Sequence, residues 1–210
     1  ASFHVEPGNW QILIGTPNTP ISLEFLHLFT SESYLMIGDN LPPANAPPES
    51  VQSILGQIHV STLGNGDGFA FGMRNHFDTD RMVFLIFYAQ FAADLGFDIS
   101  LNHYNITCQG STTEIGINGW YAQAAVWAYL MGAVGIHVDV WFFEGDVEIL
   151  GIAAAAYLGG GLPNPTWMEG RVGGRYNILG GLISGNCNFK VTIGERCQLE
   201  GGALAGVKVI

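Results

Sequence analysis

GWYAQAAVWAYLMGAVGIHVDVWF, residues 119–142, alternates between two sets of side chains with a period of two residues. Every second residue from Trp120 to Phe142 is apolar, whereas the other set is aromatic and polar and includes His137 and Asp139. This period is typical of a β-strand that buries its apolar face. The stretch is far longer than an ordinary strand of about five or six residues. It therefore predicts either one long, curved strand or two strands joined by a bend near residues 130–135.

The same period of two recurs along the chain, in residues 82–101, 147–160 and 167–193. The clearest helical period, with a Ser/Glu start, is that of ESVQSILGQI, residues 49–58, although residues 84–95 and the alanine run 153–156 are also compatible with a helix. The sequence thus predicts an all-β, mainly antiparallel fold with long strands and one short helix, arranged as a barrel or a two-layer sandwich. We expect a single domain over residues 1–210. Within it, residues 1–60 form a subregion of short strands, and residues 41–50 form a proline-rich connector.

The glycine-rich stretch GLPNPTWMEGRVGGRYNILGGLISGNC, residues 161–187, raises the question of a ligand-binding loop. A phosphate loop places its glycines between a strand and a helix, and no helical pattern follows here. From Trp167 onward the period of two continues through the glycines. The pattern favours strands with glycines within them and at their turns over a ligand-binding loop.

Charge and hydropathy exclude several classes of protein. The chain holds 18 acidic and 7 basic residues, a net charge of −11, and no basic run. Such a balance disfavours nucleic acid as a partner. No apolar run is long enough for a transmembrane helix. No motif of a hydrolase, metalloprotease or nucleotide-binding enzyme occurs, so we expect no catalytic residues and a non-enzymatic protein.

Acidic residues cluster after the long alternating stretch, at Glu144, Asp146 and Glu148. Carboxylate oxygens at this density are typical ligands of a hard cation such as Ca²⁺. The alternative is a solvated hairpin turn, which the sequence favours. No other cofactor is expected.

Two of the three cysteines, Cys187 and Cys197, flank a predicted strand and turn, and Cys108 lies far from both. In an oxidising compartment Cys187 and Cys197 could pair across a neighbouring segment, and otherwise they are buried free thiols. The spacing alone does not choose between these states.

Several stretches together resemble the TANFOR domain, a module of large proteins of Bacteroidota. They are WQILIGTPNTPISL (10–23), GNGDGFAFGMRNHFDTDRMVFLIFYAQFAADLGFDI (64–99), IGINGWYAQAAVWAYLMGAVGI (115–136) and GLPNPTWMEGRVGGRYNILGGLISGNCNFKVTIGERC (161–197). The resemblance covers nearly the whole chain and implies a secreted or cell-surface, outer-membrane-associated location. It brings no catalytic residues. At such a location we expect Cys187 and Cys197 to form a disulfide.

Three functions are compatible with the sequence. The first is an extracellular structural module that self-associates, as a homo-oligomer or filament, or packs against other surface proteins. The second is a β-barrel that binds an apolar, lipid-like ligand, and the third is a part of an outer-membrane β-barrel. The first is the leading hypothesis, because large aromatic side chains on a nominally solvent-facing strand surface usually have another surface covering them. The interface residues it predicts are Tyr121, Trp127, Tyr129 and Trp141.

Overall fold

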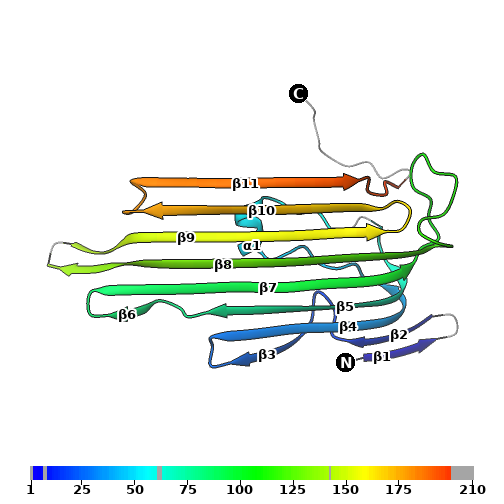
Figure 1. Ribbon diagram of the computed structural model, residues 1–210. Coiled ribbons are helices and arrows are strands. Elements are labelled where there is room, and N and C mark those ends of the chain that lie inside the picture. Colours follow the sequence, from blue (N-terminus) through cyan, green and yellow to red (C-terminus); the bar gives the residue numbers. More distant parts are fainter. Residues whose placement is uncertain (1, 7–8, 61–62, 142, 200–210) are drawn as a thin grey trace.

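The computed structural model describes residues 2–6, 9–60, 63–141 and 143–199 and shows one antiparallel sheet of 11 strands with one short helix on one side (Figure 1). The elements are β1 (Ser2–Glu6), β2 (Asn9–Ile14), β3 (Ile21–Phe25), β4 (Phe29–Leu41), α1 (Glu49–Leu55), β5 (Gly66–Asp78), β6 (Met82–Phe84), β7 (Phe87–His103), β8 (Trp120–Val140), β9 (Phe143–Leu162), β10 (Trp167–Ile178) and β11 (Ile183–Gly194). The predicted fold class, mainly antiparallel β with one short helix, is confirmed.

The strands follow one another as a meander, in the order β1-β2-β4-β5-β7-β8-β9-β10-β11. The short strands β3 and β6 pair with β4 and β7 and complete two of the hairpins. The path has two ends, β1 and β11, so the sheet is open. It neither closes into a barrel nor folds into two layers, and both of these predicted arrangements are wrong.

Within the stretch 119–142, residues 120–140 form a single long strand, β8, of 21 residues and not two strands joined by a bend, and Phe142 lies outside the described residues. The pairing of β8 with β9 shifts in register between Val134 and Gly135, where Ile149 of β9 is the extra residue. The stretch 82–101 behaves differently, because a tight turn at Leu85 and Ile86 divides it into β6 and β7. An alternating pattern therefore marks strands reliably here but does not show where a hairpin turns.

The glycine-rich stretch forms β10 and the first half of β11, which pair along their whole length. Its glycines lie in strands, where they let neighbours approach closely, and, as Gly180 and Gly181, in the β10–β11 turn. At Gly173 an added Cβ would lie 2.1 Å from the Asn188 amide oxygen and 3.0 Å from the Leu55 side chain. A larger residue here would push away the helix, so the prediction of scaffold over ligand loop is supported.

Helix α1 lies across β8, β9 and β10 and forms the main core of the molecule. Its buried residues Val51, Ile54 and Leu55 pack on Trp127 and on the small side chains of β9, mainly Ala153 and Ala155. Small residues in the strand leave room for the helix to approach the sheet. The helix ends at Gly56, which adopts a left-handed φ of 75°.

The two ends of the sheet differ in their connections (Figure 1). The segments that join β4 to β5, β7 to β8 and β9 to β10 gather at one end, together with the chain after β11; we call this the disulfide end. The hairpin turns β3–β4, β6–β7, β8–β9 and β10–β11 lie at the opposite, turn end. None of the described helices is long and apolar enough to cross a membrane.

Candidate functional site

The two faces of the sheet differ completely in chemistry. Residues that pair directly across a ladder share a face, so the register defines transverse rows of side chains. One such row consists of Met73, Phe97, Val126, Leu158, Gly170 and Val191, and the next of Asn75, Leu95, Ala128, Ala156, Val172 and Phe189. We call the surface made by these and the parallel rows the apolar face, and the opposite surface, on which α1 lies, the helix face.

The apolar face carries no charged side chain from the Leu101–Ala122–Leu162 row to the Ala89–Val134–Leu150 row. Nothing in the described structure covers it. Its exposed large apolar residues, in chain order, are Ile37, Met73, Phe91, Leu95, Ile99, Val126, Leu130, Val134, Leu150, Ile152, Leu158, Leu162, Met168, Val172, Tyr176, Ile183, Phe189, Val191 and Ile193. Soluble monomers rarely expose contiguous apolar patches beyond a few hundred Å². A face of this kind is typical of a surface that contacts another protein or a membrane.

A shallow hollow interrupts the apolar face where small residues follow one another across three strands. Ala128, Ala156 and Gly170 line it together with longer apolar side chains such as Leu158 and Phe189, around a volume of about 440 Å³. The hollow opens on the outer surface of a single sheet and is not the enclosed interior that the barrel-binding hypothesis requires.

On the helix face, Asp94 is the centre of a buried polar cluster. Its carboxylate accepts hydrogen bonds from Ser50 Oγ at 2.5 Å, His76 Nδ1 at 2.9 Å and Arg74 Nη2 at 3.4 Å. Ser50 belongs to α1, whereas Arg74 and His76 belong to β5. The cluster thus fixes the N-terminal part of the helix to the sheet, and its buried charge is compensated by direct partners.

Glu169 is the centre of a second buried cluster on the helix face. It lies 2.7 Å from Arg171 Nε, 3.3 Å from Lys190 Nζ and 3.4 Å from Arg196 Nη2. Arg171 also donates to the backbone carbonyls of Leu55 and Gln57, and Arg196 donates to that of His59. These bonds attach the end of α1 and the following segment to β10 and to the segment after β11.

The aromatic residues predicted as an interface are placed differently by the structure. Tyr121 is 1% exposed and Trp127 is 5% exposed, so both are core residues covered by the chain's own helix and loops. Tyr129 is half-buried against the helix core, and Trp141 is 95% exposed at the β8–β9 turn. The prediction of an exposed aromatic face is wrong for Tyr121 and Trp127, because the sequence pattern was assigned the wrong way round: the all-apolar set faces outward.

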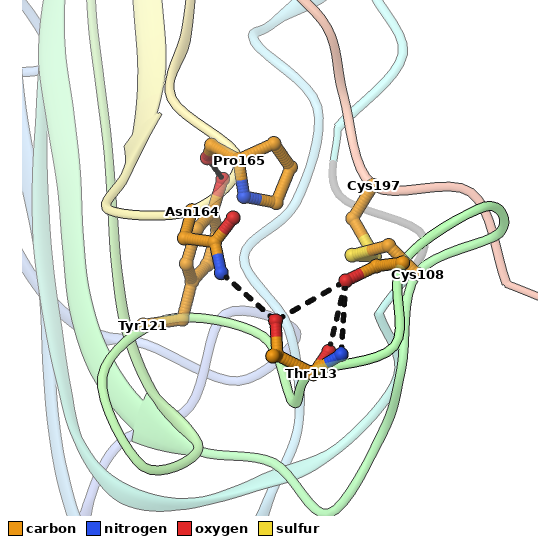
Figure 2. Close-up of a disulfide and its surroundings, with 7 residues drawn as sticks. Cys108, Thr113, Tyr121, Asn164, Pro165 and Cys197 are labelled. Carbon is orange, nitrogen blue, oxygen red and sulfur yellow. Dashed lines mark hydrogen bonds between the residues drawn. A yellow bond between two sulfur atoms is a disulfide. The ribbon is translucent and has the colours of Figure 1, made fainter.

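The disulfide end is closed by a bond that the sequence did not predict. Cys197 pairs with Cys108 and not with Cys187, which is an exposed free thiol on β11 (Figure 2). The predicted Cys187–Cys197 pair is wrong, because Cys187 projects from the apolar face whereas Cys197 lies in a core cluster with Ile115, Tyr121 and Trp167. The Tyr121 hydroxyl donates to the Pro165 carbonyl at 2.8 Å and joins this cluster to the β9–β10 connection.

Tyr104 belongs to the same cluster at the disulfide end. Burial raises the pKa of its phenol, although a hydrogen bond donated by the Asn102 side-chain amide, at 3.3 Å, opposes the shift. The phenol therefore remains neutral and acts as a hydrogen-bond partner in the core, with no sign of a proton-transfer role.

The predicted cation ligands lie near the turn end. Asp146 contacts Arg81 and, at 2.7 Å, His137 Nδ1, and Glu148 accepts a hydrogen bond from Asn177 at 2.8 Å. These carboxylates are thus used by the chain's own donors. The side chain of Glu144 lies outside the described part of the structure, so a Ca²⁺ site of all three acids stays a prediction. Among the residues that the structure does describe, no three His, Cys, Asp or Glu side chains form a group able to hold a metal ion.

Asp94 and Glu169 were not singled out by their sequence context. The sequence offers no usable signal, because an acid in an alternating strand is typical of a solvent-facing position, and only the structure shows that both acids are buried. Such acids are buried only when paired.

Scans of the sequence against protein-family models, curated proteins and solved structures return no match. The resemblance to the TANFOR domain stays a prediction from the residues quoted above. Function is therefore inferred from the two faces of the sheet alone.

Proposed function

We propose that this protein is a non-enzymatic structural section of a membrane-embedded β wall at a cell surface. The apolar face contacts lipid, and the helix face contacts the aqueous side or the interior of a larger assembly. The single observation that carries the proposal is the partition of charge. In the rows between Leu101 and Ala89 only uncharged side chains point outward, whereas Asp94, Glu169 and their cationic partners all lie on the helix face.

The dimensions of the apolar face agree with those of a bilayer. Trp10 and Trp120 lie on this face toward the disulfide end, and Tyr176 lies in the row of Gly132 and Ile152 toward the turn end. From Trp120 to Gly132 the strand rises about 40 Å at about 3.3 Å per residue. Strands in membranes tilt by about 45°, which reduces this span to about 28 Å, close to the apolar band of about 25 Å flanked by aromatic residues.

The open edges of the sheet support a role in an assembly. β1 and β11 each leave one side of the strand without a neighbour in the described structure. Backbone N–H and C=O groups at membrane depth must be hydrogen-bonded, because lipid offers them no partner. Other copies of the chain, other surface proteins or further strands of a longer protein must therefore pair with β1 and β11.

Vesicle flotation of apolar-face variants tests the proposal. Leu130→Arg and Val172→Arg place a charge in the middle of the apolar face, which costs about 2–4 kcal/mol at the centre of a bilayer. Ser184→Arg adds the same charge to the exposed helix face of β11 and is the matched control. We expect the wild type and Ser184→Arg to float with phosphatidylcholine vesicles and both apolar-face variants to remain in the dense fraction.

Two results would contradict the proposal. The first is equal flotation of all four proteins. The second is a wild type that stays monodisperse without detergent and ignores vesicles, which indicates that a protein surface covers the apolar face.

A further inference from the structure

The turn end of the sheet carries a row of exposed apolar residues that the strand pattern does not require. Leu85 is 80% exposed and Leu182 is 79% exposed, in two different hairpins. The row, which we call the apolar turns, consists of Leu26, Leu28, Leu85, Ile86, Trp141, Leu179 and Leu182. Short hairpin turns that end in water are usually built from Gly, Asn, Asp and Ser.

The backbone at three of these turns makes the choice of leucine more unusual. Leu26, Leu85 and Leu179 have φ values of 52°, 55° and 53°, in the left-handed region. This conformation disfavours a residue with a branched side chain and favours Gly or Asn. Neither solvent exposure nor backbone geometry accounts for leucine at three separate hairpins. Strained positions that persist in this way tend to mark functional surfaces.

Charged residues lie near the β6–β7 turn. Asp78, Asp80 and Arg81 lie in and beside the β5–β6 connection, and Arg81 pairs with Asp146 of β9, which His137 also contacts. The three acids outnumber the single arginine in this group. This excess of negative charge near the apolar turns disfavours an anionic surface and favours a neutral one.

We propose that the apolar turns insert into the interfacial layer of a zwitterionic bilayer, while the disulfide end remains in water. The inference rests on the proposed membrane role and adds a second lipid contact and an orientation. The hairpin turns lie at or beyond the row of Gly132 and Tyr176, which is the far border of the apolar band. Ending the hairpins within the lipid interface at that border removes the leucines from water and keeps the nearby acids at headgroup level.

Site-specific fluorescent labelling tests the orientation. In a Cys187→Ser background, a single thiol is introduced as Leu85→Cys at a turn, Val172→Cys on the apolar face or Thr112→Cys in the exposed loop at the disulfide end, and each is labelled with a polarity-sensitive fluorophore. With phosphatidylcholine vesicles, we expect lipid-bound quenchers to quench the labels at positions 85 and 172. Aqueous iodide should quench only the label at position 112.

The pattern of quenching separates this inference from the proposed function. A lipid-quenched label at 172 with an iodide-quenched label at 85 overturns the insertion of the turns and leaves the membrane role standing. An iodide-quenched label at 172 overturns the membrane role itself. Lipid quenching at 85 and 112 alike overturns the orientation.

A second variant makes the test independent of folding defects. The double variant Leu85→Asn with Leu179→Asn introduces a residue that tolerates the left-handed backbone and removes the two apolar side chains. We expect native circular dichroism and about tenfold weaker binding to phosphatidylcholine vesicles. Added phosphatidylserine should weaken binding of the wild type as well. Unchanged vesicle binding of the double variant would refute the role of the turns.

Discussion

The Tyr34 hydroxyl donates a hydrogen bond of 2.6 Å to Asp98, reaching from β4 to β7 across the intervening strand β5. The ring passes over Gly72, where an added Cβ would lie 2.2 Å from the Asp98 carboxylate and 2.5 Å from the Tyr34 ring. Glycine at this position of β5 is what allows the two side chains to meet. Both partners are buried on the helix face, so the bond compensates a carboxylate that water does not reach freely.

Removing the Tyr34 hydroxyl is expected to lower the free energy of unfolding by about 1–3 kcal/mol, because Asp98 would lose its partner while remaining buried. Urea unfolding of Tyr34→Phe, followed by circular dichroism, measures this loss, with Tyr176→Phe on the apolar face as the matched control. Gly72→Ala should be destabilising by breaking the same bond. The double variant should then cost less than the sum of the two single changes, and strict additivity would contradict the shared contact.

Neutralising Glu169 is expected to lower the stability by about 2 kcal/mol, because three cations would lose their common acceptor. The expected loss of stability is small because Lys190 and Arg196 are partly exposed to water, which screens their attraction to Glu169. Chemical denaturation of Glu169→Gln measures this loss. Limited proteolysis should also cut the segment after α1 more readily in the variant, because Arg171 and Arg196 hold that segment in place. Glu195→Gln, an exposed acid nearby, should leave both properties unchanged.

Loss of the Cys108–Cys197 disulfide is expected to cost about 2–4 kcal/mol, because the bond closes a long loop in the unfolded chain. Thermal unfolding of Cys197→Ser measures the effect. Cys187→Ser should behave as the wild type, since Cys187 is a free thiol. Intact mass after alkylation of the oxidised protein should show one modified cysteine. Three modified cysteines would mean that the bond does not form.

Trp127 and Trp141 belong to one set in the alternating sequence but are expected to respond differently to truncation. Trp127→Ala should lower the stability by about 3–5 kcal/mol, because it opens a cavity beneath α1. Trp141→Ala should lower it by less, because truncating a side chain that is 95% exposed at a turn leaves no buried cavity. Equal losses in urea unfolding would show that the two rings share an environment.

The strands could be predicted from the sequence because their period of two persists over whole hairpins, as in β8 and β9. The face of the sheet on which each set of side chains lies could not be predicted. Alternation separates two sets of side chains but does not state which set faces water, and the assumption that the apolar set is buried placed Trp127 outside and Leu130 inside. The acids Asp94 and Asp98 in the other set supported the same assumption, and only the structure shows that they are buried with hydrogen-bond partners.

The turn at Leu85 and Ile86 could not be predicted from the sequence either. Hairpin turns are recognised by Gly, Asn or Asp at left-handed positions, and Leu85 occupies such a position without that signature. The cysteine pairing failed for another reason: nearness in sequence favoured Cys187, whereas the antiparallel register points its side chain to the opposite face from the core that holds Cys197.

The order of the strands along the sheet affects how the chain reaches the correct register between strands as it folds. Most strands pair only with the next strands along the path, so hairpins can add one at a time, and nothing in a single hairpin reports on the alignment of distant ones. The Cys108–Cys197 disulfide is a covalent contact between distant parts of the path, since its cysteines meet across an 89-residue separation in the chain and enclose β8 to β11. A slip of two residues in any of these ladders displaces one cysteine by about 7 Å, beyond the reach of a disulfide. The disulfide can therefore form only when these ladders are correctly aligned. Its formation reports that the four enclosed strands, β8 to β11, have paired in the native register.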